Sequence, residues 1–327
     1  MAKYFVTGAT GFIGGEIVKQ LVGRGHKVVA LVRAPERATM LKALGVEMHS
    51  GDITDRETLK TPMTGVDGVF HVAAWYKVGV REPLADQINV DGTRNVLQTM
   101  RALEIPRGVY TSTVAVFSDT KGLVPDETYR YDGPHLSQYD RTKWIAHYRV
   151  AQPKMDDGLP LSIVMPGLVY GPGDTSGMHT AMVDLLRGRL PMTPARTAFC
   201  WAHVEDTARG HILAMEKGRP GETYVIAGPR HAFEEAFALA ATLARVRAPM
   251  LHPGPRVMRA MAVLMQAAER FLTLPAALTP EALRVLAGTT YFGSNEKAVR
   301  ELGFTARPLE EGLAQTLEHE LRLLGRV

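Results

Sequence analysis

The sequence predicts an α/β fold, in which a Rossmann-type, doubly wound parallel sheet is joined to a smaller, mainly helical C-terminal substrate-binding part. Short apolar runs alternate with longer helical patterns through the first two-thirds of the chain, as in repeated β-α units. These runs, for example residues 28–32, are apolar throughout, which is typical of strands covered by helices on both faces. A glycine-rich turn directly follows the first run.

The individual elements follow from these patterns in chain order. Apolar runs place the strands at residues 3–7, 27–33, 46–50, 68–73, 107–112, 161–166 and 223–227. Apolar residues that recur every three or four positions place helices at 12–24, 36–44, 84–103, 136–150, 178–188, 206–217, 232–246, 256–273, 279–288, 294–302 and 308–324. After about residue 230 we expect helices only. We therefore expect a dinucleotide-binding domain at 1–166, completed by a sheet segment at about 200–230, and a substrate-binding part at 167–199 and 231–327.

Composition and charge exclude several classes of protein. With 327 residues, of which 46% are hydrophobic and 22% charged, the chain is typical of globular proteins and not of disordered or disulfide-stapled ones. The net charge is +4 and the cations form no five-residue run, so we expect no nucleic-acid partner. No apolar stretch reaches 18 residues and the N-terminus has no signal segment, so we expect a cytoplasmic protein without a membrane partner. The single cysteine, Cys200, excludes a disulfide within the chain and is expected to serve packing.

The turn after the first strand carries three glycines at the spacing G-x-x-G-x-x-G. Glycine lets the backbone turn tightly and approach a diphosphate, which then faces the N–H groups and the positive dipole end of the following helix. A purely structural turn is the alternative, but the strand before it and the helix after it favour dinucleotide binding. We therefore assign cofactor binding in this turn to Gly8, Thr10, Gly11, Phe12, Ile13 and Gly14.

The end of the second strand bears on the choice between NAD and NADP. An acid at this place grips the ribose 2′-hydroxyl of NAD, whereas an arginine accommodates the 2′-phosphate of NADP. Here the acid is missing, and Arg33 and Arg37 offer guanidinium groups that suit bidentate contact with phosphate. NADP is therefore favoured and NAD is the alternative cofactor. The other interpretation is that both arginines are solvated surface residues.

Tyr139 and Lys143 stand four residues apart in a segment with helical periodicity, so they share one helix face. An ammonium at roughly 4 Å, in an effective dielectric of about 20, favours a phenolate by about 4 kcal/mol, which lowers the phenol pKa by on the order of three units. Tyr139 is then expected to act as a general acid during hydride transfer to a carbonyl. An ordinary surface pair is the alternative. Ser112 and Thr113, at a predicted strand end, are expected to offer a hydroxyl to the same substrate oxygen.

Further motifs match one known family: Gly51-Asp52-Ile53, His71-Val72-Ala73-Ala74 and the segments 89–95, 166–172 and 201–206. With the glycine turn and the Tyr-x-x-x-Lys pair, they make the sequence resemble the extended short-chain dehydrogenase/reductase family. That family includes sugar-nucleotide epimerases, dehydratases and dihydroflavonol reductases. The resemblance extends from about residue 3 to about residue 320, nearly the whole chain.

The resemblance implies roles for single residues. Thr113 corresponds to the family's catalytic Ser/Thr, with Ser112 as the alternative, and Tyr139 and Lys143 contact the cofactor as well. The other implied cofactor contacts are Asp52 and Ile53 at the adenine, Ala73 and Ala74 along the dinucleotide, and Pro166 and Val169 at the nicotinamide. The helices at 84–103 and 136–150 are implied to pair into a homodimer. One departure, Met165-Pro166 in place of the frequent Arg-Pro, suggests a substrate without a nucleotide.

We therefore predict an NADP-dependent oxidoreductase that reduces a ketone or an aldehyde with Tyr139, Lys143 and Thr113. Residues 217–224 resemble the dihydroflavonol reductase branch. Two alternatives stay open, namely an NAD-dependent sugar-nucleotide epimerase or dehydratase, and a non-catalytic dinucleotide sensor. No metal is expected, because the segment 203–206 has no recognised ligand spacing and is better explained as a capped helix start. A structural role is expected for His71, and a core position for Met258, Met261 and Met265.

Overall fold

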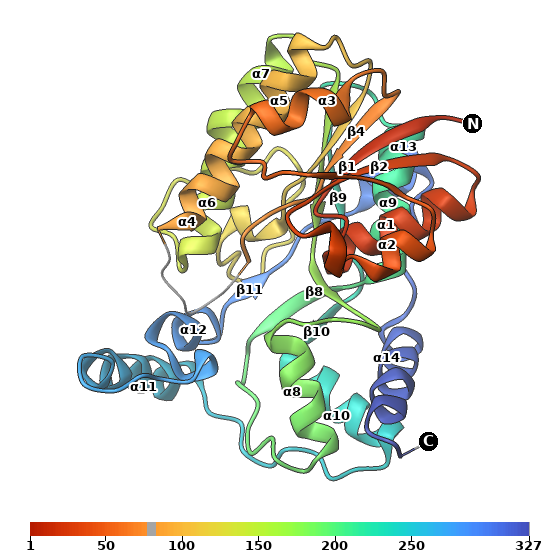
Figure 1. The fold of residues 1–327 in the computed structure, drawn as a ribbon. Helices are drawn as coiled ribbons and strands as arrows, with labels where there is room; N and C mark the ends of the chain where they lie inside the picture. Colours follow the sequence, from red (N-terminus) through yellow and green to blue (C-terminus); the bar gives the residue numbers. More distant parts are fainter. Residues whose placement is uncertain (77–82, 327) are drawn as a thin grey trace.

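The computed structural model describes residues 1–76 and 83–326. A larger α/β unit contains the N-terminus, and a smaller unit below it contains the C-terminus (Figure 1). Within the described residues, none of the helices has both the length and the apolarity needed to cross a bilayer.

The larger unit contains a seven-stranded parallel sheet with the strand order β3-β2-β1-β4-β5-β6-β9. This confirms the predicted fold class and the positions of all seven predicted strands. Their bounds are β1 (Lys3–Thr7), β2 (Lys27–Val32), β3 (Glu47–Ser50), β4 (Gly68–His71), β5 (Gly108–Thr111), β6 (Leu161–Pro166) and β9 (Thr223–Ile226). The strand order reverses between β1 and β4, so the connections diverge there and a crevice forms at the carboxyl ends of the strands.

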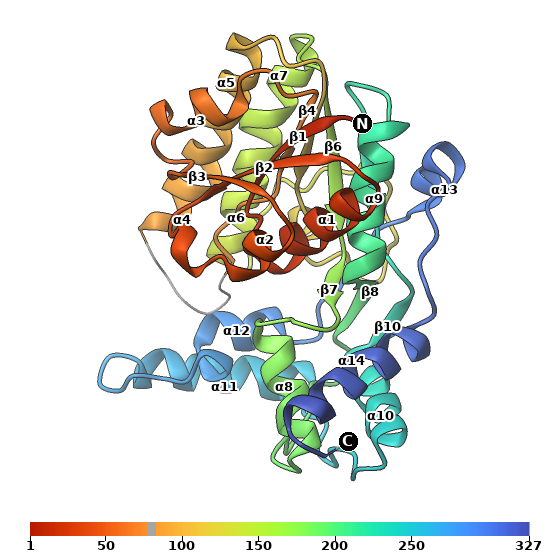
Figure 2. The ribbon, with the colours of Figure 1, turned by 45° about the vertical axis from the view of Figure 1, so that its right-hand side comes forward.

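Alternate side chains of the strands enter two separate cores, one on each face of this sheet. In β2, Val28 and Ala30 belong to one core, whereas Val29 and Leu31 belong to the other. The first core is covered by α1 (Phe12–Gly23), α2 (Thr39–Ala43), α9 (Val204–Glu216) and α13 (Glu296–Leu302). The second is covered by α3 (Glu57–Met63), α5 (Thr93–Ala102), α6 (Gln138–Ile145) and α7 (Gln152–Asp156), as Figure 2 shows. Burial on both faces explains why the strands are apolar throughout.

Several helices differ from their predicted bounds. The helix expected at 84–103 consists of α4 (Leu84–Asp86), the π-helical η2 (Gln87–Gly92) and α5. The helix expected at 136–150 continues from α6 through the π-helical η4 (Ala146–Ala151) into α7. The segment expected at 36–44 is split into η1 (Pro35–Arg37) and α2. The helix α3 was not predicted, because its seven residues include Pro62 and are too few to show a clear period.

The smaller unit contains a second sheet, in which β8 (Ala198–His203) pairs with β7 (Leu168–Tyr170), β10 (Arg230–Ala232) and β11 (Thr290–Tyr291). The prediction of helices only after residue 230 is therefore wrong. Strands of two or three residues carry no readable period, and they form here because β8 supplies their backbone partners. The remaining elements are η3 (Val114–Phe117), α8 (Gly177–Leu186), α10 (Phe233–Ala244), α11 (Pro255–Ala268), η5 (Ala276–Leu278), α12 (Pro280–Val285) and α14 (Leu309–Leu323).

Two packing predictions are confirmed in this unit. Met258 is buried between α11 and α12, and Met261 and Met265 pack against the same small core. Cys200 is fully buried on β8, with its Sγ 3.7 Å from the carbonyl oxygen of Gly293. Burial raises the pKa of this thiol to about 11, so it stays protonated and serves packing.

Candidate active site

A single cavity of about 560 Å³ lies at the carboxyl ends of β1, β2, β4, β5 and β6. It collects every predicted site residue except Arg37. The predicted residues that line it are Gly8, Thr10, Gly11, Phe12, Ile13, Gly14, Arg33, Asp52, Ile53, Ala73, Ala74, Ser112, Thr113, Tyr139, Lys143, Pro166 and Val169. Positions far apart in the sequence thus meet at one edge of the sheet, as the fold requires of a binding crevice.

The glycine turn has little space for side chains. Gly8 has φ of +71°, and a Cβ built on it would lie 2.7 Å from the backbone nitrogen of Ala73. A Cβ on Gly14 would lie only 2.2 Å from the carbonyl oxygen of Gly8. Glycine is therefore required at both positions by the turn itself, which brings β1, α1 and the end of β4 close together.

The N-terminus of α1 faces this cavity with its first turn. Its N-cap residue, Gly11, has no side chain to accept a hydrogen bond, and the first turn contains no acidic residue. Phe12, Ile13 and Gly14 of that turn line the cavity, and first-turn N–H groups have no acceptor within a helix. With the positive end of the helix dipole, this cradle fits the diphosphate of a dinucleotide.

Only one of the two predicted arginines reaches the cavity. Arg33 follows β2 and lines it, together with Asp52 and Ile53 after β3. Arg37 lies outside the lining in η1, where its exposed side chain has its Nε 4.0 Å from a carboxylate oxygen of Glu36. The Asp52 carboxylate accepts two hydrogen bonds of 2.9 Å from the backbone and hydroxyl of Thr54, which fix its orientation.

The proposed catalytic residues meet at the ends of β5 and α6. Lys143 is buried, and its Nζ donates to the carbonyl oxygen of Thr111 at 2.6 Å and to the hydroxyl of Tyr110 at 3.1 Å. Thr113 caps η3, with its Oγ1 accepting from the backbone N–H of Ala115 at 3.1 Å. The Thr113 hydroxyl also lies close enough to the phenol of Tyr139 to lower its pKa. A hydroxyl, a phenol and an amine thus meet beside one cavity.

The electrostatics of this cluster differ from the prediction. The expected lowering of the Tyr139 pKa by Lys143 is wrong for this structure: burial raises that pKa above its usual value, although the hydrogen bond from Thr113 opposes the rise. Burial also lowers the pKa of Lys143 from 10.5 to about 7. Part of the lysine is therefore neutral near pH 7, and its Nζ is directed at Thr111 and Tyr110.

The structure distinguishes the two hydroxyls at the end of β5. Ser112 lines the cavity, but its Oγ lies 2.7 Å from Nδ1 of the buried His147. The Thr113 hydroxyl instead acts on Tyr139, whose pKa it lowers. Ser112 therefore has its hydroxyl committed elsewhere, and Thr113 is the better candidate to orient a substrate oxygen.

The other end of the cavity, here called the substrate end, is lined by Tyr76, Leu168, Phe199, Val285 and Tyr291. The sequence did not single out any of these side chains. The rings of Tyr76 and Tyr139 meet edge to face, with centroids 4.8 Å apart. Phe199 and Tyr291 are stacked 5.7 Å apart on the paired strands β8 and β11. Asp174, Thr175 and Ser176, in the loop after β7, also line the cavity.

A buried acid connects the two units beside Tyr139. Asp140 on α6 accepts a 3.1 Å hydrogen bond from the hydroxyl of Tyr291 on β11. Its backbone N–H donates to Oγ of Ser137, which caps α6. Burial raises the pKa of Asp140 from 3.8 to about 7, against the effect of its hydrogen bonds with Ser137 and Tyr291. The contact therefore holds α6 and β11 together at the substrate end.

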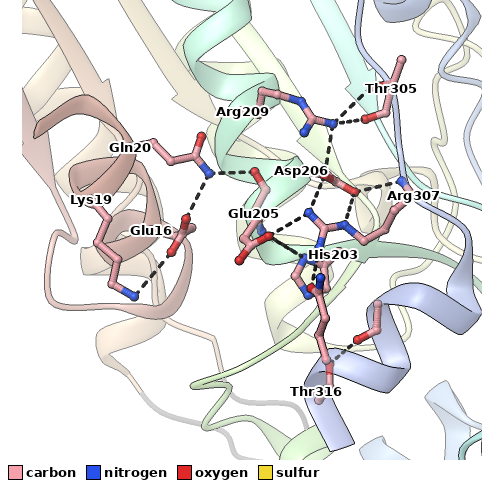
Figure 3. Close-up of polar contacts among 12 residues, drawn as sticks. Glu16, Lys19, Gln20, His203, Glu205, Asp206, Arg209, Thr305, Arg307 and Thr316 are labelled. Carbon is pink, nitrogen blue, oxygen red and sulfur yellow. Dashed lines mark hydrogen bonds and ion pairs between the residues drawn. The ribbon is translucent and has the colours of Figure 1, made fainter. Parts of the chain in front are cut away.

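The secondary candidates from the sequence have structural roles. His71 is buried between the hydroxyls of Thr7 at 2.8 Å and Thr93 at 3.0 Å, and burial lowers its pKa to about 3. His203 caps α9 with its Nδ1 accepting from the backbone N–H of Glu205. Arg307 bonds both Asp206, at 2.9 Å, and Glu205, at 2.8 Å, as Figure 3 shows. Among the described residues, no group of three metal-ligating side chains comes together.

Comparisons with known proteins agree with the resemblance seen in the motifs. The model of a family described as the NAD dependent epimerase/dehydratase family matches residues 4–227. The chain is 32% identical over 312 residues to the 4-hydroxy-2-methyl-3-oxo-4-farnesyl-3,4-dihydroquinoline-1-oxide ketoreductase of Stigmatella aurantiaca, covering 93% of this chain and 92% of that protein. A putative dihydroflavonol 4-reductase of a Synechocystis species is 30% identical over 327 residues, with 96% and 93% covered. The crystal structure of gox2253 matches with a TM-score of 0.85 and 30% identity over 100% of both chains.

Proposed function

The chain belongs to the NAD-dependent epimerase/dehydratase family and is an oxidoreductase of the extended short-chain dehydrogenase/reductase type, and from this premise we propose that it reduces an apolar ketone or aldehyde with NADPH. One observation carries the proposal. The Tyr139, Lys143 and Thr113 cluster opens onto a cavity whose far end is lined by aromatic and aliphatic side chains together with carboxyls and without a cation among the described residues.

In this proposal each of the three clustered residues has its own role in the reduction. NADPH, when bound, supplies the hydride to the carbonyl carbon. Tyr139 donates its proton to the carbonyl oxygen, and the raised pKa means that the phenol carries this proton before the transfer. Thr113 orients the oxygen, and Lys143 holds the ribose of the cofactor and supports reprotonation of the tyrosine.

The charges of the lining favour a substrate without a diphosphate. Of the described residues that line the cavity, Arg33 and Lys143 are the cations, and both belong to the cofactor side. At the substrate end the charged side chains are the carboxyls of Asp140 and Asp174. A sugar nucleotide would bring its diphosphate to these acids without a partner, which is unfavourable. The name of the Stigmatella relative, a ketoreductase of a farnesylated quinoline oxide, supports an apolar substrate.

The preference for NADP rests on Arg33. It stands at the end of β2, where an acid would bind the 2′-hydroxyl of NAD, and it forms no ion pair with the described residues. A guanidinium there matches the 2′-phosphate in charge and geometry. NAD is the alternative cofactor, and it belongs to the alternative function of an epimerase or dehydratase.

The proposal also covers the division of the chain into a cofactor part and a substrate part, its location and its oligomeric state. Residues 1–166, with the segment at about 200–230, serve the cofactor, and residues 167–199 and 231–327 serve the substrate. We further propose a cytoplasmic homodimer that pairs α5 and α6 with their copies across a two-fold axis. A monomeric mass by light scattering at micromolar concentration would contradict the dimer.

A carbonyl screen tests the proposed activity. The purified protein is mixed with NADPH and a panel of cyclic, aromatic and long-chain ketones and aldehydes, and NADPH absorbance is followed. We expect consumption with at least one apolar carbonyl compound. The same preparation is denatured and its supernatant assayed for released dinucleotide. Tightly bound NAD, together with turnover of a UDP-sugar and none of the carbonyl panel, would favour the epimerase alternative.

A further inference from the structure

The helix α11 projects away from both sheets, and both views show it at the edge of the molecule (Figures 1 and 2). One face of it packs on α12, where Met258 and Ala262 meet Leu283 and Ala287 in a small core. The rest of its surface is open to solvent in the monomer, so its composition is not explained by packing.

A second apolar face runs along α11 beside the packed one, about 100° from it around the helix axis. Val257 is 53% exposed and Leu264 is 63% exposed, and their spacing of seven residues places them on one face. Seven residues further, in the turn after the helix, Phe271 is 85% exposed. Leu272 beside it is 63% exposed. We call Val257, Leu264, Phe271 and Leu272 the apolar stripe.

Cations accompany the apolar stripe. Arg256 and Arg259 are exposed and lie on one strip of the helix surface next to the stripe, with the exposed Val263 between them, and Arg270 is exposed in the turn after the helix. Between residues 250 and 275 the only acid is Glu269, so three arginines face one carboxylate. An exposed helix with an apolar face and an arginine-rich flank has the pattern of a helix that lies in a membrane interface.

We propose that α11 docks the protein on an anionic lipid surface, with the apolar stripe at the boundary of head groups and acyl chains and the arginines on lipid phosphates. The positive charge beside the apolar stripe distinguishes between two surfaces that could cover it, a second copy of the protein and a lipid bilayer. A second copy of the stripe is equally apolar and equally cationic, whereas an anionic bilayer complements both features. The sequence prediction of no membrane partner was based on the lack of a spanning segment, which such a helix does not need.

The position of α11 connects the docking surface to the cavity. It packs on α12, and Val285 of α12 lines the substrate end. Docking therefore brings the apolar end of the cavity next to the bilayer, where an apolar carbonyl compound would be dissolved. This last link rests on the proposed function, whereas the docking itself does not.

Vesicle flotation tests the docking. Full-length protein is floated with vesicles of phosphatidylcholine, with and without about one-third phosphatidylglycerol, at low and high salt. We expect binding to the anionic vesicles that weakens with salt. The double variant Leu264→Gln/Phe271→Gln should lose binding at least roughly tenfold, and Arg256→Gln/Arg270→Gln should lose the preference for anionic lipid. The matched control is Leu323→Gln on α14, an equally exposed leucine at 68%, which should bind like the parent.

Two results would overturn the docking proposal. One is the absence of binding to anionic vesicles at low salt. The other is self-association without lipid, seen by sedimentation velocity, that Leu264→Gln/Phe271→Gln abolishes, because the stripe would then be a protein interface. Both variants lie outside the cavity lining, so their carbonyl reduction with a water-soluble substrate should equal that of the parent. Failure of docking is thus separate from failure of the proposed activity.

Discussion

The cofactor end and the substrate end of the cavity are built in different ways. The cofactor end consists of consecutive residues in short turns, and its shape is fixed by backbone contacts such as those at Gly8 and Gly14. The substrate end consists of side chains from distant segments, including Phe199, Val285 and Tyr291, which meet through a second sheet of short strands. The first end tolerates almost no added atom, whereas the second can change its side chains without disturbing the large sheet. One fold can therefore keep its cofactor chemistry while its substrate varies.

The largest effect is expected at Tyr139, where the two ends meet. Tyr139→Phe removes only the phenol oxygen, so the fold and NADPH affinity should remain while turnover falls by roughly 10²–10⁴-fold, as for a lost general acid. Steady-state rates and a fluorescence titration of NADPH measure both quantities. Tyr148→Phe on η4 makes the same chemical change outside the cavity lining and should keep full activity. A Tyr139→Phe enzyme with the parent's rate would contradict the assignment of Tyr139 as the general acid.

Substitution of Lys143 is expected to lower both turnover and the affinity for NADPH. Lys143→Ala removes the amine that we propose to hold the ribose of the cofactor and to support reprotonation of Tyr139. Turnover should therefore fall by about 10²-fold, and NADPH affinity should fall as well. Lys154→Ala on α7 is a control that lies outside the lining. A variant that loses turnover but keeps NADPH affinity would leave Lys143 with a role in proton transfer only.

Substitution of Arg33 is expected to change the affinity for the cofactor only. Arg33→Asp places a carboxylate against the 2′-phosphate, so NADPH affinity should fall by roughly 10- to 100-fold while NADH affinity is kept or improved. Arg37→Asp is the matched control, because Arg37 lies outside the cavity lining. Titration of each variant with both cofactors gives the comparison. Equal affinity of the parent for NADPH and NADH would contradict the assignment.

The smallest expected effect concerns stability at the substrate end. A carboxyl whose folded pKa is raised favours the folded state when protonated, and this contribution is lost as the pH rises from about 4 to above about 7. Asp140→Asn imitates the protonated form, so it should melt several °C above the parent at about pH 9 and show no such gain at about pH 4. Asp206→Asn should do the opposite: although burial alone raises the pKa of Asp206, its bonds with Arg307 hold that pKa below its ordinary value, so the variant should be less stable near pH 7.

The residues that line the cofactor end of the cavity could be identified from the sequence because their determinants are local. Gly8, Gly11 and Gly14 lie in one turn, and Arg33 lies at the end of a continuous apolar run. Tyr139 and Lys143 share a helix face through simple spacing. Each of these features is contained in a short segment, so each is readable without knowledge of the tertiary structure.

The substrate end was not predictable for physical reasons. Tyr291 reaches Asp140 across 151 positions of sequence, through a strand of two residues that exists only by pairing with β8. The pKa of Tyr139 was also mispredicted, because spacing gives the helix face but not the burial or the carbonyl that holds Lys143. Local patterns contain neither long-range pairing nor desolvation.

An isotope measurement tests the central claim most directly. The protein is incubated with NADPH that carries deuterium at both C4 positions and with an apolar ketone found in the screen, and the products are analysed by mass spectrometry and NMR. The account predicts an alcohol with one deuterium on the carbinol carbon and an equal amount of NADP⁺. A product formed without net consumption of NADPH would show that the hydride is taken and returned on the same molecule, and would contradict the assignment of this cleft as a carbonyl reductase.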